Sequence, residues 1–93
     1  MDYSTDLMNQ IEECGKRLMT PNETALYLQI DEIALSDDIS TKGKEVRKRY
    51  LHGVMTSVYN MREGMLATAN AGSPYALTAC KELLLKTLSE ANI

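Results

Sequence analysis

The stretch KEVRKRYLHGVMTSVYNMREGMLATANA, residues 44–71, sets the fold class. It contains no proline, and apolar side chains recur in it every three or four residues, which is the spacing of one helical face. At about 1.5 Å per residue, the predicted helix is roughly 40 Å long. We expect its apolar face to serve as core or as an interface between helices, and it consists of Val46, Tyr50, Val54, Val58, Met61, Met65 and Ala69.

The residues that follow this helix predict a turn and a second helix. Gly72 suits the left-handed position after a helix, while Ser73 and Pro74 suit the cap and first position of the next one. A last helix over residues 74–89 carries several leucines on its apolar side. Because the connection is so short, residues 44–90 are predicted to form a long antiparallel helical hairpin.

Shorter helices are predicted before residue 40. Thr20-Pro21-Asn22-Glu23 has the pattern of a capping box, in which Thr20 and Glu23 each bond the other's backbone amide. Asp31 is suited to cap a further short helix, and residues 4–18 carry apolar side chains at helical spacing. The sequence therefore predicts one all-α domain over residues 1–93, a small helical bundle.

Residues 20–39 have the shape of a helix-turn-helix pair, which is two short helices joined by a tight turn. Gln29 occupies the turn position where glycine is usual, and the second helix carries Asp37 and Asp38 but no Lys or Arg. Phosphate groups repel carboxylates. The scaffold is therefore predicted, whereas reading of DNA by its second helix is not favoured.

The start of the long helix is the better candidate for contacting nucleic acid. Five basic residues cluster there: Lys42, Lys44, Arg47, Lys48 and Arg49. Lysine and arginine neutralise phosphate charge, and a helix start presents free backbone amides to anions. The alternative is a solvated helix start whose basic side chains pair with the acids of the preceding helix.

The inventory of reactive residues argues against an enzyme. His52 is the single histidine, and Cys14 and Cys80 are too far apart in sequence for a CxxC motif. No phosphate-binding glycine loop or calcium loop is present, so we expect no catalytic site, no metal, no cofactor and no small-molecule substrate. We also expect two reduced thiols, no membrane-spanning segment and a cytoplasmic location.

Charge is unevenly distributed along the chain of 93 residues, whose net charge is −3. Residues 1–40 hold nine acidic and two basic residues, a net of −7, whereas residues 41–93 have a net of +4. Such asymmetry can steer a charged partner. One alternative function is therefore a helical protein–protein adapter whose acidic N-terminal third docks a basic protein, without nucleic acid.

The order of these parts resembles the small terminase subunits and related helix-turn-helix proteins of tailed phages and prophages. The similar segments lie within about residues 20–90: Thr20–Leu28 with the Ile30-Asp31 turn, the basic start Val46–Tyr50, and Ala67–Ala76. The resemblance implies a DNA-packaging or prophage DNA-binding protein that forms a homo-oligomer through its helical hairpin. Our leading hypothesis is accordingly a non-catalytic protein that binds double-stranded DNA and self-associates through its long helices.

Overall fold

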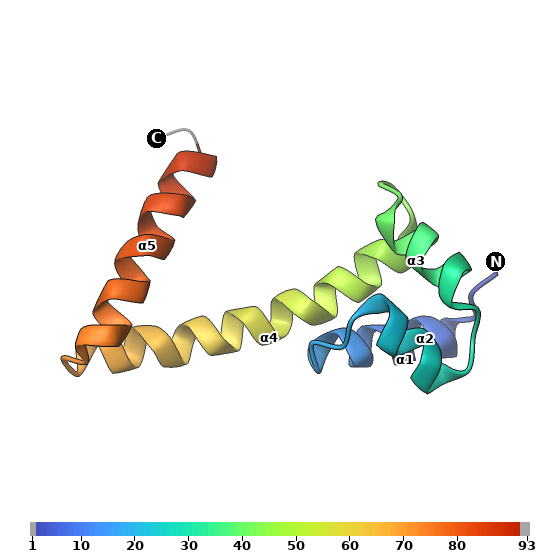
Figure 1. The fold of residues 1–93 in the computed structure, drawn as a ribbon, viewed down its shortest axis with the longest axis horizontal. Helices are drawn as coiled ribbons and strands as arrows, with labels where there is room; N and C mark the ends of the chain where they lie inside the picture. The colour runs from blue at the N-terminus through green and yellow to red at the C-terminus, as the bar shows by residue number, and fades with distance from the viewer. Residues whose placement is uncertain (1, 92–93) are drawn as a thin grey trace. The chain divides into compact units, whose positions relative to one another are not determined.

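The computed structural model describes residues 2–91 and is all-α over that range, as the sequence predicts. The helices, drawn in Figure 1, are α1 (Thr5–Lys16), α2 (Pro21–Leu28), α3 (Glu32–Ser40), α4 (Glu45–Asn70) and α5 (Pro74–Glu90). Their bounds agree closely with the predicted ones.

Polar side chains that cap the helix starts explain why these boundaries could be predicted from the sequence. Thr20 and Glu23 form the predicted capping box, since the Glu23 amide donates to Thr20 Oγ1 (3.1 Å) and the Thr20 amide donates to Glu23 Oε1 (2.9 Å). Asp31 accepts from the Ala34 amide and Ser73 from the Ala76 amide. Each cap satisfies a backbone donor that the helix itself leaves free.

The chain divides into two compact units between Val58 and Tyr59, a boundary that falls within α4. Unit 1, before this boundary, holds the hydrophobic core, to which α1, α2, α3 and the first part of α4 all contribute. The core residues are Ile11, Ala25, Leu35, Ile39, Val46 and Tyr50. The Tyr50 hydroxyl donates to the carbonyl of Met19, so its polar end is also satisfied.

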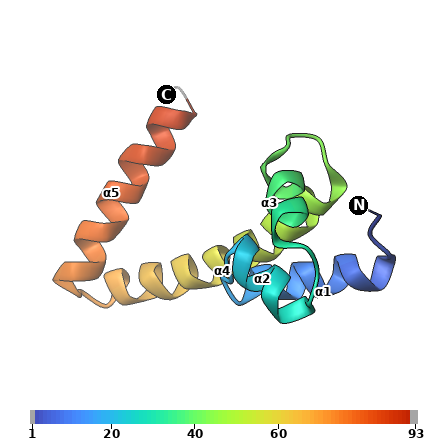
Figure 2. The same ribbon diagram turned by 45° about the vertical axis from the view of Figure 1, so that its right-hand side comes forward.

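The helix-turn-helix pair is formed by α2 and α3, which pack against each other in unit 1 (Figure 2). Gln29, at the turn position where glycine is usual, adopts the left-handed conformation (φ 58°, ψ 45°). A non-glycine residue costs about 1 kcal/mol or more in this conformation. The turn is therefore made without glycine, at a small cost that the packing of unit 1 offsets.

Two glycines let α1 and α4 approach closely in unit 1. A Cβ atom at Gly53 would overlap the Glu12 carbonyl oxygen and lie 3.0 Å from the Lys16 amide nitrogen. One at Gly15 would overlap the Tyr50 carbonyl oxygen and lie 3.2 Å from the Val54 amide nitrogen. The backbones of the two helices therefore touch where each sequence has a glycine.

In unit 2, from Tyr59 on, the turn at Gly72 leads from the end of α4 into α5, and the two helices diverge beyond it (Figures 1 and 2). α5 has no buried residue. An open depression of about 240 Å³ lies between the two helices. Its lining includes Leu66 of α4 and Cys80, Leu83 and Leu84 of α5.

The apolar face of α4 changes character along its length. Val46 and Tyr50 are buried in the core of unit 1, and Val54 and Val58 are partly buried. In unit 2, Met61 is 58% exposed, Met65 is partly buried and Ala69 is buried. The face thus belongs to the core of unit 1 in its first half, and its exposure varies from residue to residue in its second half.

No helix within residues 2–91 combines the length and the apolar character that crossing a bilayer requires.

Candidate nucleic-acid interface

Arg49 is held inside unit 1 by side chains of α1. Its Nε donates to Glu12 Oε1 (3.0 Å), and its Nη2 donates to Asn9 Oδ1. His52 Nδ1 lies 3.2 Å from the same Glu12 oxygen. The carboxylate of Glu12 therefore links α1 to α4, and the charge of Arg49 is largely committed to this contact.

Arg47 and Lys44 are also engaged within unit 1. Arg47 Nη1 donates to the Ile39 carbonyl (2.6 Å), which caps the end of α3. Lys44 Nζ lies 3.7 Å from Asp38 Oδ1, and Asp38 in turn accepts a hydrogen bond from the Tyr3 hydroxyl (2.6 Å). The Tyr3 hydrogen bond and the Lys44 charge hold the pKa of Asp38 below its ordinary value.

Lys42 and Lys48 differ from the other three basic residues. Both are exposed, and neither has an ion-pair partner among residues 2–91. Lys48 lies one helical turn after Lys44, so these two lysines share a face of the chain at the start of α4. Of the five predicted phosphate ligands, Lys42 and Lys48 are therefore the most available to a partner.

The Glu12 contact predicts how the stability of the protein depends on pH. Burial alone would raise the pKa of Glu12, but hydrogen bonds from Arg49 and His52 outweigh burial and lower it. A carboxyl group with a lowered pKa stabilises the fold above its unfolded pKa, about 4.3, and this contribution is lost as the pH falls through the folded value. We expect Glu12→Gln to lower the Tm near pH 7, and the difference from wild type to close near pH 3.

Thermal unfolding followed by circular dichroism measures the Tm of the wild type and of Glu12→Gln across this pH range. Glu63→Gln is the matched control, because Glu63 is exposed and has no ion-pair partner within the described residues. It should change the Tm little at either pH. A Tm difference for Glu12→Gln that is as large near pH 3 as near pH 7 would contradict the assigned contact.

The acidic residues of α3 point in different directions. Asp38 is turned towards Tyr3 and Lys44, whereas Glu32 and Asp37 are exposed and, within residues 2–91, have no ion-pair partner. The outward side of the second helix of the pair is therefore negatively charged. This side would meet phosphate groups with repulsion rather than attraction.

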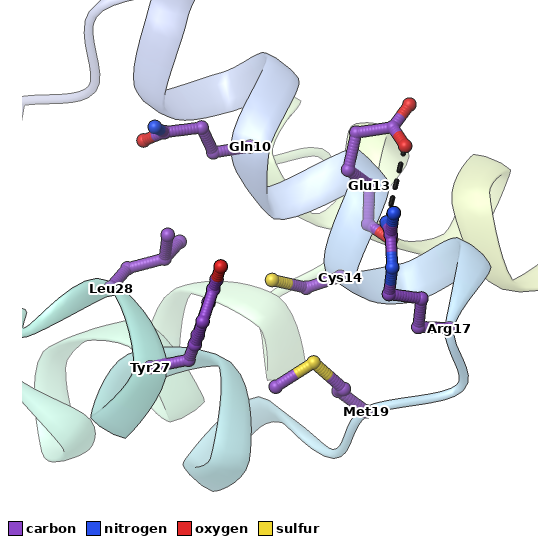
Figure 3. A pocket seen from close by; sticks show the side chains of 7 residues that line it. All are labelled: Gln10, Glu13, Cys14, Arg17, Met19, Tyr27 and Leu28. Atoms are coloured by element: carbon purple, nitrogen blue, oxygen red, sulfur yellow. Dashed lines mark hydrogen bonds and ion pairs between the residues drawn. The ribbon is translucent and has the colours of Figure 1, made fainter.

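A depression of about 430 Å³ lies between α1 and α2 in unit 1 (Figure 3). Cys14, Met19, Tyr27 and Leu28 give it a mainly apolar lining, which Gln10, Glu13 and Arg17 complete. Glu13 and Arg17 are engaged with each other (3.3 Å). Burial raises the pKa of the Cys14 thiol, so the thiol stays protonated and is a poor nucleophile.

No histidine lines this depression beside Cys14. His52, the single histidine, contacts Glu12 on α1 rather than a cysteine or serine. Across residues 2–91, no three His, Cys, Asp or Glu side chains gather as a metal site would require.

Comparison with known proteins assigns no family or function to the chain. No family model, curated protein or solved structure matches the chain. The resemblance to small terminase subunits therefore stays a proposal that depends on the residues of this chain alone.

The three large apolar residues of α3 do not share one side of the helix. Leu35 and Ile39 are buried, whereas the side chain of Ile33 is 76% exposed. Helical geometry explains the difference, since residues four apart share a face and residues two apart lie on nearly opposite faces. The spacing of the three positions therefore predicts that Ile33 and Leu35 lie on nearly opposite faces of α3.

Proposed function

We propose that this protein is a non-catalytic, self-associating DNA-binding protein of the DNA-packaging kind that the resemblance to phage and prophage proteins implies. Unit 2 joins copies together, and unit 1 contacts the phosphates of double-stranded DNA through Lys42 and Lys48. Both cysteines are free thiols, which fits a role in the cytoplasm.

The observation that carries the proposal is the exposed apolar surface of unit 2. Seven of its large apolar side chains are exposed by 43–90% in the single chain: Tyr59, Met61, Leu66, Tyr75, Leu77, Leu84 and Leu85. Helical spacing puts Tyr59 and Leu66 on one side of α4, and Leu77 and Leu84 on one side of α5. Exposed apolar sides of this kind are unfavourable in water and mark a site of association.

A second copy of the chain is the natural occupant of this surface because unit 2 is electrically balanced. From Tyr59 on, Arg62, Lys81 and Lys86 are matched by Glu63, Glu82 and Glu90. Two such surfaces have no net charge to repel each other, and their mixed signs allow pairs across the interface.

Self-association would also explain how a chain with only two free lysines at this site can bind DNA. Two lysines on one chain give only weak affinity for phosphate, since each contact releases about one counterion. Copies joined through unit 2 present these lysines repeatedly, and linked sites bind far more tightly than separate ones. The acidic side of α3 would then face away from the DNA.

The salt dependence of DNA binding tests the phosphate contacts. We expect anisotropy of a labelled duplex to report binding at about 50 mM salt that weakens strongly by about 200 mM. Lys42→Ala/Lys48→Ala should weaken binding and reduce the slope of log K against log salt by about 2 for each chain engaged.

Lys16→Ala/Arg17→Ala is the matched control, because it removes the same charge from α1, where both side chains pair with Glu13, and should leave the slope unchanged if Lys42 and Lys48 make the contacts. Absence of binding at about 50 mM salt would refute the DNA-binding role. Equal losses in the two double variants would refute the assignment to Lys42 and Lys48.

A further inference from the structure

The turn between α2 and α3 and the start of α3 form an exposed surface that the proposed function does not use. Ile30, Asp31, Glu32 and Ile33 line an open depression of about 450 Å³. Ile33 is 76% exposed, the largest exposed fraction among the isoleucines and leucines in unit 1. Asp37 follows Ile33 by one helical turn and therefore lies on the same side of α3.

Charge distinguishes this surface from the apolar surface of unit 2. Asp31 and Glu32 line the depression together with Ile33, and none of Asp31, Glu32 and Asp37 has an ion-pair partner within residues 2–91. Asp31 caps α3 through the Ala34 amide, so its carboxylate is fixed in place. An exposed apolar side chain beside carboxylates is complementary to a segment that carries an apolar residue flanked by Lys or Arg.

Two other occupants fit less well. Duplex DNA would bring phosphates against the three carboxylates. In a second copy, Arg47 and Arg49 bond within unit 1, so Lys42 and Lys48 are the free basic residues of residues 42–50. The apolar residues of that segment, Val46 and Tyr50, are buried in the core and cannot pack against Ile33. A separate protein with a basic segment that also has a free apolar side fits better.

We propose that the α3 surface formed by Ile30, Asp31, Glu32, Ile33 and Asp37 docks a basic, amphipathic helical segment of another protein. Ile33 packs against the apolar side of that segment, while Glu32 and Asp37 pair with its Lys or Arg side chains. A self-associating protein would thus present the same docking surface once in every copy.

A labelled helical peptide of leucine and lysine, about 14 residues or four turns long, is a suitable probe for the full-length protein. We expect saturable binding in fluorescence anisotropy, and about tenfold weaker binding to Ile33→Ser and to Glu32→Gln/Asp37→Asn. A lysine–serine peptide of the same charge should bind about tenfold more weakly than the leucine–lysine peptide, because it cannot pack against Ile33.

Asp2→Asn/Asp6→Asn is the charge-matched control, because both residues are exposed and neither has an ion-pair partner within residues 2–91; it should bind the leucine–lysine peptide within about twofold of wild type. Equal weakening by this control, or equal binding of the two peptides, would show general attraction to an acidic protein and overturn the proposal. Ile33→Ser should leave the oligomeric mass unchanged; a lower mass would make a second copy the occupant instead. Lys42→Ala/Lys48→Ala should weaken duplex binding but leave binding of the leucine–lysine peptide unchanged. Failure of this proposal can therefore be told apart from failure of the proposed function.

Discussion

Replacing Gly53 by alanine is expected to lower the free energy of unfolding of unit 1 by about 3 kcal/mol or more. Alanine is ordinarily the better helix former by about 1 kcal/mol, so propensity alone predicts the opposite sign. The added Cβ, however, would overlap the carbonyl oxygen of Glu12 on α1. Because the obstructing atoms are backbone, relief requires α1 and α4 to separate, which opens the core at Ile11 and Tyr50.

Thermal unfolding followed by circular dichroism measures this effect, and a decrease in Tm of more than about 10 °C is expected. Gly64 provides a control on the same helix, because a Cβ there meets nothing within 4 Å. Gly64→Ala should raise the stability by about 0.5–1 kcal/mol. If the two substitutions shift the Tm in the same direction, the close crossing of α1 and α4 is wrong.

Replacing Leu84 by aspartate is expected to dissociate the oligomer that we propose. Leu84 is 57% exposed in the single chain and lies on the lining of the depression between α4 and α5. A carboxylate placed in an apolar interface loses its hydration without gaining a partner, which costs several kcal/mol. The dissociation constant should therefore rise at least about a hundredfold, while the helical circular dichroism signal stays near that of wild type.

Leu26→Asp is the matched control, since Leu26 has a similar exposure of 63% but lies on α2 in unit 1. Light scattering coupled to size exclusion should find the wild-type mass for Leu26→Asp and a smaller mass for Leu84→Asp. Duplex binding should weaken in Leu84→Asp as well, because the lysines of separate copies no longer act together. An unchanged mass in Leu84→Asp would remove α5 from the assembly surface.

Local chemistry made the helices of this protein predictable from sequence. Thr20, Asp31 and Ser73 each cap a helix through a bond to an amide three residues later, and such contacts depend on neighbouring residues alone. The left-handed Gln29 shows the limit of the same reasoning. Its conformation is imposed by the packing of α2 on α3, which outweighs the preference for glycine at that position.

The candidate site was less predictable because pairing across the fold decides which charges are free. The sequence places five basic residues together, but Glu12 and Asn9, about 40 positions away, determine that Arg49 is engaged. Asp37 and Asp38 are adjacent in sequence, yet Asp38 alone meets Tyr3. Long-range contacts of this kind leave no local pattern in the sequence. The sequence alone therefore could not show that Lys42 and Lys48 are free while the other three basic residues are engaged.

Self-association through unit 2 is the claim on which the proposed function depends, and sedimentation equilibrium of the wild-type chain at about 50 µM tests it most directly. We predict a mass that is a multiple of the 10.4 kDa chain and decreases on dilution or with Leu84→Asp. A single 10.4 kDa species at every concentration would contradict it.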